Sequence, residues 1–574
     1  MLSSPSKFNN QDEVYDFDFS YNLSLNFYPI RYDLDLHLRQ GADRHNGLVE
    51  VQIYCQAQSP ILTLHLDDRW LIVKQLLLIG PNRRPIDIAA LRFNRVQQTM
   101  SIELGHGRLF ETHMVYALRV EYSLHSQDFK VTRDVSSLTR MKGNFYTILT
   151  QPIKSRRVFP CFDEPRFRSV FRLRVSLYDF PPDTVVLSNT RGTVVRYHDH
   201  ATCTFDETLP MATYILQMTV GSYERICTRL GALDDGKVFL PQSHFCVHYP
   251  IGDVTSEFFE NHNVNRQNMT AKLAHRANIG YRNITEYLGG LQPPGKVHLV
   301  FAPMHPDVGG MEYWGLISVQ MYYLSRSWEE ISDVFDHELL HYWFGNLVTP
   351  TRWADLWLSE SVTEHLQEII FGKECKYYYN DNRHKHEPLP VVDNGWIWRD
   401  DAVHHDAYQH GTAILRMFAR ILGDDVIRHI INKYVRRYQM FHASTEDWFD
   451  IVKEDLTIRS LDLSIIDSWR SFLYNVGRPV VLIHNNTQTR SVYLEHPDVS
   501  LTSINYSNAT QQHWVIPVWV RLRDWKQTEI RWIAPDRPVV ITLPNQANAN
   551  FWDNWVFINE NVGHDLPYVM RYTR

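Results

Sequence analysis

The residues with the clearest capacity for chemistry lie in the segment Asp336-His337-Glu338-Leu339-Leu340-His341 and at Glu360. Histidines four positions apart project from one face of a helix, where both can bind a single metal ion. Eighteen residues separate His341 from Glu360, which is enough for the chain to turn back and supply a third, anionic ligand. Three protein ligands leave a fourth position open, as in catalytic sites. The sequence therefore predicts one Zn²⁺ per chain, held by His337, His341 and Glu360.

A bare pair of histidines at this spacing arises by chance in many helices, so the surrounding sequence has to support the site. Ser327 and Glu330 form a capping box that predicts the start of the helix. A second helix is predicted over Ser359–Ile370, with Gly372 past its end. Zinc lowers the pKa of water and polarises a carbonyl, and Glu338 is placed to act as the general base. This gluzincin pattern predicts hydrolysis of amides.

The segment Val308–Ile317 bears on where a peptide would be cut. By itself it is typical of a glycine-rich turn between strands. Because it precedes the zinc helix, it could also place a strand edge along the cleft, so that Glu312 meets a substrate α-ammonium. A carboxylate that binds the free amine predicts an exopeptidase. The substrate-binding residues predicted here are Gly309, Gly310, Met311 and Glu312.

Three structured regions are predicted to position these residues, in a multi-domain α+β protein with a disordered acidic tail at residues 1–20. Residues 21–226 alternate with period two and predict an antiparallel β-sandwich. Residues 227–478 mix helices and strands and predict an α/β catalytic domain. Residues 479–574 alternate again and predict a small β-sandwich. Besides the two site helices, the predicted helices are Gln267–Leu288, Gly411–Leu422, Asp425–Tyr438, Ser444–Leu456 and Ser464–Tyr474.

The composition and charge of the chain bear on which functional classes it can belong to. The 574 residues carry a net charge of −7, which gives no support for nucleic-acid binding. No apolar run is long enough to cross a bilayer. The polar N-terminus lacks the pattern of a secretory leader, so we expect a cytoplasmic protein. Aromatic residues make up 13% of the chain, including 16 Trp, and we expect them to fill cores.

The six cysteines are scattered and include no CxxC pair, so the sequence favours dispersed, buried thiols. The cysteines are Cys55, Cys161, Cys203, Cys227, Cys246 and Cys375.

These motifs together resemble the zinc aminopeptidase family of alanyl aminopeptidase (aminopeptidase N). The HExxH segment with Glu360 matches the ligand pattern of the family, and several other segments match its further motifs. They are Gly309–Tyr313 (similar to GAMEN), Trp357–Glu360 (WLNE), Tyr408–Gly411 (YxKG), Gly345–Thr349 and Arg157–Pro165.

The resemblance implies a thermolysin-like catalytic domain, bound zinc and peptide substrates with a free N-terminus. It also implies that Tyr408 stabilises the tetrahedral oxyanion, as the tyrosine of the family does. Without the family match, a core tyrosine at a helix start would be an equally ordinary interpretation.

The chain departs from the family pattern at several positions. Tyr313 replaces Asn, Ser361 replaces Gly and His410 replaces Lys. Pro152 and Ile153 stand where relatives carry an acidic or amide residue that binds the amine, so we expect weaker amine binding and less strict end selection. The sequence also stops where the family usually adds a large helical domain over the cleft. A short form of this kind would have a wetter site.

Other functions stay open on the sequence alone. The main alternative is a weak or inactive pseudo-peptidase that binds peptides or a partner protein. An endopeptidase with loose end selection and an epoxide hydrolase are further alternatives, although no residue singles out the last.

Other polar residues near the predicted site are expected to have minor roles. His404 and His405 are expected to be solvated, Glu364 to be a surface charge or a partner of the site, and Asp355 could hydrogen-bond a ligand histidine.

Overall fold

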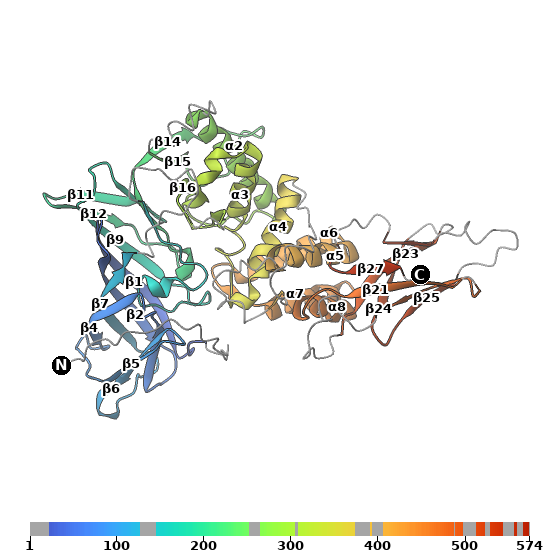
Figure 1. Cartoon of the computed structure of the whole chain (residues 1–574), viewed down its shortest axis with the longest axis horizontal. Helices are drawn as coiled ribbons and strands as arrows, with labels where there is room; N and C mark the ends of the chain where they lie inside the picture. Colours follow the sequence, from blue (N-terminus) through green and yellow to red (C-terminus); the bar gives the residue numbers. More distant parts are fainter. Residues whose placement is uncertain are drawn as a thin grey trace, which may run out of the picture.

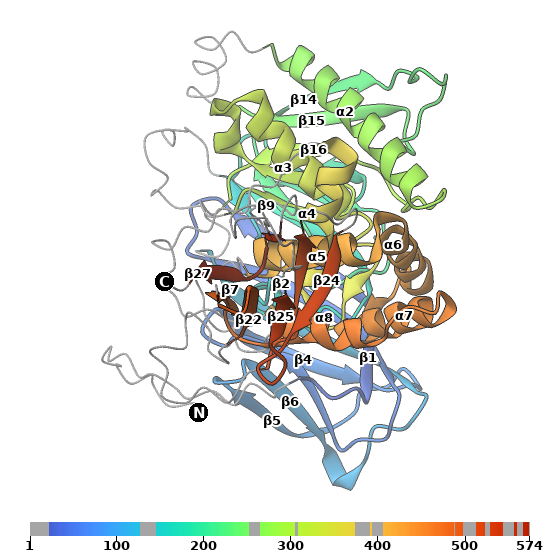
Figure 2. The same cartoon turned by 90° about the vertical axis from the view of Figure 1, so that its right-hand side faces the viewer.

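The computed structural model describes residues 22–126, 145–251, 265–304, 308–372, 391–392, 406–486, 488–496, 513–522, 528–542, 556–559 and 566–572. Strands dominate the N-terminal part of the chain, helices the middle, and strands the C-terminal part (Figure 1). The C-terminal strands lie beyond α5 and α8, away from the N-terminal sheets (Figure 1), and in the view from their side of the molecule they lie in front (Figure 2). The prediction of a β-rich N-terminal region followed by a helix-containing region is confirmed.

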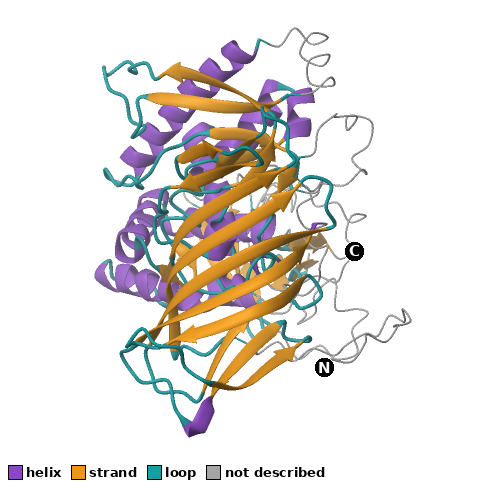
Figure 3. Cartoon of the chain, turned by 90° about the vertical axis from the view of Figure 1, so that its left-hand side faces the viewer, coloured by secondary structure: helices purple, strands orange, loops and turns teal. Residues whose placement is uncertain are grey.

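The largest N-terminal sheet has seven strands in the order β11-β12-β9-β1-β2-β7-β4, and Figure 3 shows its broad face. Its long strands alternate buried and partly exposed residues, as the period-two sequence pattern predicts. The strands are β1 Phe27–Arg39, β2 Arg44–Cys55, β4 Leu71–Ile79, β7 Val115–His125, β9 Val170–Tyr178, β11 Gly192–Arg196 and β12 His200–Phe205.

This sheet corrects one expectation, because it is not purely antiparallel. β1 and β9 pair in parallel, with Tyr32 opposite Phe171. Only strands joined by a short hairpin are forced to run antiparallel, and well over a hundred residues separate these two. Two three-stranded sheets complete the region. They comprise β3 Ile61–His65, β5 Ile88–Asn94 and β6 Thr99–Leu104, and then β8 Tyr146–Thr147, β10 Val185–Ser188 and β13 Met218–Gly221.

The middle of the chain contains a five-stranded sheet in the order β14-β15-β16-β18-β17. β17 is the edge strand, so the segment that contains Gly310 does form a strand at a sheet edge. The strands are β14 Tyr223–Arg229, β15 His244–Pro250, β16 Leu299–Ala302, β17 Gly310–Met311 and β18 Ile317–Gln320. A short parallel pair, β19 Thr349–Pro350 and β20 His442–Ala443, follows the site helices.

The helices begin and end within about two residues of the predicted positions, because their end signals are local. Ser327 and Ser444 each form a complete capping box. Gly372 ends α4 in the left-handed conformation with φ 70°. The helices are α2 Arg266–Tyr287, α3 Trp328–Leu340, α4 Trp357–Phe371, α5 Gly411–Leu422, α6 Asp424–Tyr438, α7 Thr445–Ile458 and α8 Ser464–Tyr474.

Large aromatic side chains fill the core between the later helices, as the composition predicts. Trp357 of α4 and Trp448 of α7 pack edge to face with ring centroids 5.7 Å apart. Phe418 of α5 stacks on Trp469 of α8 at 4.6 Å. All four side chains are fully buried. Trp448 also packs edge to face with Trp469 at 5.9 Å, so this aromatic cluster connects α4 with α5.

The C-terminal strands form a four-stranded sheet in the order β25-β22-β21-β27 and a three-stranded sheet in the order β24-β23-β26. The strands are β21 Val480–Asn486, β22 Ser491–Glu495, β23 Ile516–Leu522, β24 Glu529–Ile533, β25 Val539–Thr542, β26 Val556–Ile558 and β27 Val569–Tyr572.

The cysteines correct a second expectation. Cys227 and Cys246 lie directly opposite each other on β14 and β15 and form a disulfide. The sequence favoured thiols because the two cysteines are far apart along the chain, whereas strand pairing brings their Cα atoms to 4.1 Å. Cys55, Cys161 and Cys203 are buried free thiols, as predicted. Cys375 lies outside the described residues.

Among the described residues, no helix combines the length and the apolar character that crossing a bilayer requires.

Candidate metal centre

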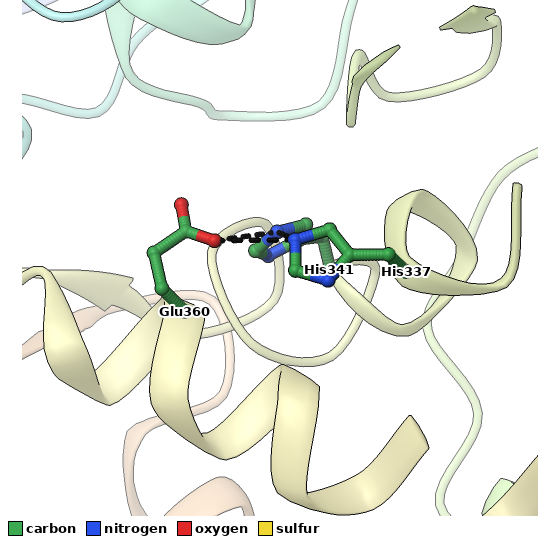
Figure 4. A group of neighbouring side chains, drawn as sticks. All are labelled: His337, His341 and Glu360. Atoms are coloured by element: carbon green, nitrogen blue, oxygen red, sulfur yellow. Dashed lines mark hydrogen bonds and ion pairs between the residues drawn. The ribbon is translucent and has the colours of Figure 1, made fainter. Parts of the chain in front are cut away.

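Two helices bring the three predicted metal ligands together. His337 lies in the last turn of α3 and His341 caps its C-terminal end, while Glu360 lies in the first turn of α4. The two Nε2 atoms are 2.9 Å apart. Glu360 Oε2 lies 3.3 Å from His337 Nε2 and 3.1 Å from His341 Nε2. In Figure 4 the carboxylate of Glu360 points at both rings. Within the described part of the chain, these residues form the one cluster with ligand atoms close enough to share a metal ion.

The spacing of the ligand atoms fits a tetrahedral zinc ion. Ligand bonds of about 2.0–2.1 Å at tetrahedral angles place the ligand atoms about 3.3 Å apart. The observed separations of 2.9, 3.1 and 3.3 Å come close to this value. Two neutral imidazoles and one carboxylate are also a donor set that zinc accepts in catalytic sites. The residues present therefore fit the ion that the motif predicts.

The charge around the cluster also favours a cation. Burial would raise the pKa of Glu360, but the two ligand histidines outweigh burial and lower it to about 2. Burial would lower the pKa of His341, yet Glu360, Glu312 and Glu338 raise it to about 10. Three carboxylates thus surround one imidazole, and the pocket favours positive charge.

The ring of His341 is oriented by contacts at its other nitrogen. Its Nδ1 lies 2.8 Å from the carbonyl oxygen of Phe344. Two hydroxyls of α4 also approach Nδ1, with Ser359 Oγ at 3.1 Å and Thr363 Oγ1 at 3.3 Å. An Nδ1–H that donates to the carbonyl leaves the lone pair of Nε2 free for the metal. Sequence reasoning did not identify these partners, although Ser359 and Thr363 lie one helical turn apart beside Glu360.

An ion pair with α2 holds α3 at the residue before the first ligand. Asp336 is fully buried, and Arg276 of α2 binds both of its carboxylate oxygens, with Nε at 2.8 and 2.9 Å. Because Asp336 directly precedes His337, this bidentate pair fixes the helix backbone at the first ligand. A bidentate contact between α2 and α3 cannot be read from sequence spacing.

Glu338 lies in the pocket with its carboxylate prepared to accept a proton. The side chain is buried, and Oε2 has no hydrogen-bond partner among the described residues. Burial raises the pKa of Glu338 well above its ordinary value, and Glu312 and Glu360 raise it further. Gly310 allows the carboxylate to lie against β17, because a Cβ at that position would be 2.4 Å from Glu338 Oε1.

Glu312 follows β17 and is also buried. Its backbone carbonyl accepts a 2.7 Å hydrogen bond from the Asn346 side chain. The next residue, Tyr313, donates its hydroxyl to the carbonyl of Ile148 at 3.2 Å, so the N-terminal region braces this segment. Burial raises the pKa of Glu312, and the charges of His341 and Glu360 act on it in opposite directions. Glu312 therefore interacts electrostatically with two of the metal ligands.

Tyr408 joins the site from a separate element. Asp406–His410 forms a five-residue π-helical turn before α5, which we call the Tyr408 turn. The half-buried ring of Tyr408 lies nearly parallel to that of His337, with centroids 6.2 Å apart. Burial raises the pKa of Tyr408 well above its ordinary value, and Glu360, Glu312 and Glu338 add to the effect. The hydroxyl therefore stays protonated and can donate a hydrogen bond.

Asp355 and Glu364, which the sequence predicted near the site, make different kinds of contact in the structure. Asp355 does not contact a ligand histidine, which corrects that expectation. Its Oδ1 accepts hydrogen bonds from the backbone and hydroxyl of Thr445, at 2.9 and 2.8 Å, at the start of α7. Helix N-termini attract carboxylates. Asp355 therefore binds the start of α7, although the ligand Glu360 lies closer to it in the sequence. Glu364 is half-buried and accepts from Thr412, so it is a partner of the site region. His404 and His405 lie outside the described residues.

Comparisons with known proteins agree with this geometry. Residues 28–215 match the Peptidase M1 N-terminal domain, and residues 282–469 match the Peptidase family M1 domain. A putative aminopeptidase-2 of Caenorhabditis elegans is 25% identical over 66% of this chain and 20% of its own length. The thyrotropin-releasing hormone-degrading ectoenzyme of Mus musculus is 23% identical over 96% of this chain and 50% of its own.

Aminopeptidase A of Gloydius brevicauda is 24% identical over 87% of this chain. The match spans 51% of that relative, so the chain covers about half the length, or less, of these relatives. The second family match contains His337, His341, Glu360 and Tyr408, and both matched domains occur in the order that the sequence motifs predict. The chain belongs to peptidase family M1.

Proposed function

We propose that the protein is a zinc-dependent aminopeptidase that hydrolyses the N-terminal residue from peptides. The observation that carries this proposal is the set of three buried carboxylates, Glu312, Glu338 and Glu360, around two histidines. One divalent zinc ion and one substrate α-ammonium together supply the three positive charges that balance them. A substrate with a blocked amine would offer no positive charge to Glu312, whose charged form burial disfavours.

Each residue then has a task in hydrolysis. Bound zinc would be held by His337, His341 and Glu360, and would supply Lewis-acid activation of the carbonyl and of water. Glu338, with its unpartnered buried oxygen, takes the proton from the attacking water and passes it to the leaving amine. The protonated hydroxyl of Tyr408 donates a hydrogen bond to the oxyanion that develops on the former carbonyl.

Glu312 orients the substrate. Its carboxylate accepts hydrogen bonds from the α-ammonium, and the adjacent edge strand β17 offers free backbone groups along which an extended peptide can lie. Gly309, Gly310 and Met311 would supply this edge. The distance from the amine-binding carboxylate to the base then fixes the scissile bond after the first residue.

Turnover of an aminoacyl anilide, compared with its N-acetylated form, tests the proposal. We expect cleavage of the free-amine substrate alone, loss of activity with a chelator and recovery with added zinc. Glu338→Gln should lower kcat/KM by about 10²- to 10⁴-fold, the range of general acid–base catalysis. Full activity of Glu338→Gln would contradict the mechanism, and equal cleavage of the acetylated substrate would indicate an endopeptidase. Binding without turnover would indicate the pseudo-peptidase.

A further inference from the structure

The Tyr408 turn is joined to α4 by hydroxyl groups that take no part in the proposed chemistry. Ser361 is fully buried, and its Oγ donates to the carbonyl oxygen of Ala407 at 2.5 Å. Ser361 directly follows Glu360, and Ala407 directly precedes Tyr408. One hydrogen bond therefore connects the neighbour of a metal ligand with the neighbour of the tyrosine.

Thr412 makes a second connection from the first turn of α5. Its Oγ1 lies 2.7 Å from the carbonyl oxygen of Tyr408, 3.1 Å from Glu364 Oε2 and 3.2 Å from the carbonyl oxygen of Ser361. The side chain of Thr412 is 1% exposed. Thr412 Oγ1 thus lies within hydrogen-bond distance of the Tyr408 turn and of two residues of α4, and its single proton is donated to one of these acceptors at a time.

The backbone at Gly411 leaves room for the Ser361 hydroxyl. A Cβ at Gly411 would lie 2.1 Å from Ser361 Oγ, so glycine leaves the space that the hydroxyl occupies. The side chain of His410, the N-cap residue of α5, makes no capping hydrogen bond. The preceding turn is π-helical. Such turns are rare in proteins, and those that occur are frequently found at functional sites. The turn is therefore held from outside, by the side chains of α4 and α5.

The serine at position 361 is a feature of this chain. The resembling family carries glycine at that position, and glycine has no hydroxyl to donate. We propose that Ser361 and Thr412 are positioning residues, which fix the Tyr408 turn against α4 and so set where the Tyr408 hydroxyl lies relative to the metal ligands. This inference rests on the proposed function, because it assigns Ser361 and Thr412 an effect on catalysis through Tyr408.

The kinetic test uses the full chain loaded with zinc. Ser361→Ala and Thr412→Val should each lower kcat about five- to tenfold, as expected for one net hydrogen bond. KM should stay within about twofold, since Glu312 and the metal ligands are untouched. Thr412→Ser keeps the hydroxyl and should behave like wild type. Ser468→Ala is the matched control, because its buried Oγ also donates to a carbonyl, that of Val515, at 2.6 Å.

A double-mutant cycle separates positioning from general destabilisation. In a Tyr408→Phe background, Ser361→Ala and Thr412→Val should have no further effect on kcat, because the group that they position is gone. Effects that multiply in full would overturn the proposal. Wild-type kcat in both single variants would also overturn it, whereas an inactive wild-type protein would overturn the proposed function instead.

Hydrogen exchange gives a readout that is independent of turnover. In metal-free protein, Ser361→Ala should speed amide exchange in Ala407–Gly411 about fivefold or more, because the turn loses an external hydrogen bond. Ser468→Ala should leave that segment unchanged. Equal exchange in wild type and Ser361→Ala would show that the hydroxyl does not hold the turn, and would overturn the proposal even if kcat falls.

Discussion

The metal ligands and the Tyr408 turn lie side by side but are held by different means. His337, His341 and Glu360 are carried by two regular helices, of which α3 has a capping box and a bidentate ion pair at Asp336. Tyr408 is carried by an irregular turn that is held by hydroxyls of neighbouring helices. Contacts between helices matter for both parts, because hydroxyls of α4 also approach His341, but only the tyrosine is carried by an irregular turn.

The largest expected effect comes from removing a ligand. Glu360→Ala should weaken zinc binding by more than about 100-fold, because a ligand matters more than an outer partner, which is worth about 10- to 100-fold. Metal content after dialysis against a competing chelator measures the loss. Glu329→Ala, an exposed glutamate of α3, is the control. Retention of tightly bound zinc by Glu360→Ala would contradict the ligand set.

Tyr408→Phe should separate the contribution of the Tyr408 turn from that of the metal ligands. We expect kcat to fall about 10²- to 10³-fold, as for loss of an oxyanion-hole donor. Zinc content should stay at the wild-type value, since Tyr408 contacts His337 through its ring, which phenylalanine retains. Loss of the metal in this variant would show that the two contributions are not separable.

The sequence predicted the helices that carry the metal ligands because their signals are local. Capping by Ser327, the spacing of the two histidines and the stop at Gly372 are local signals, and all three are present in the structure. What could not be predicted depends on tertiary packing. The disulfide between Cys227 and Cys246, the parallel pairing of β1 with β9, and the binding of Asp355 to α7 each join segments that are distant in sequence or in different elements.

The hydrogen bonds of the Tyr408 turn belong to the same class. The resemblance singled out Tyr408 and marked Ser361 as a departure, but nothing in the sequence indicated that Ser361 reaches Ala407. Nor does a period-three-to-four pattern predict a π-helical turn. Irregular segments near a site are thus the part of the fold least accessible from sequence, and Ser361, a departure from the family pattern on α4, contacts one of them.

Gly310→Ala should disturb the base without removing a ligand. The added methyl would lie 2.4 Å from Glu338 Oε1, so the carboxylate has to shift. Displacement of a reacting group by about 1 Å costs up to about 100-fold in rate, and we expect kcat to fall at least tenfold with zinc retained. Gly231→Ala, which has open space around its Cβ, is the matched control. Wild-type kcat in Gly310→Ala would show that the carboxylate adapts freely.

The smallest effect concerns Glu364, which lies on α4 and accepts from Thr412 at the junction of α4 and α5. Burial raises its pKa from 4.5 to about 7. Between those pH values the folded protein keeps a proton that the unfolded chain releases, so the free energy of unfolding falls as pH rises through this window. Glu364→Gln cannot ionise and escapes this loss.

We therefore expect Glu364→Gln to melt at a higher temperature than wild type at pH 8, with the difference shrinking toward pH 5. Glu446→Gln should show the opposite sign, because hydrogen bonding to Arg470 lowers the pKa of Glu446. Its charged form stabilises the fold above the ordinary pKa, so the substitution destabilises at pH 8 and less so as the pH falls. Thermal unfolding of the three proteins across this range measures both trends. If Glu364→Gln raised the melting temperature equally at every pH, the gain would come from packing. The prediction that Glu364 titrates at this junction would then be wrong.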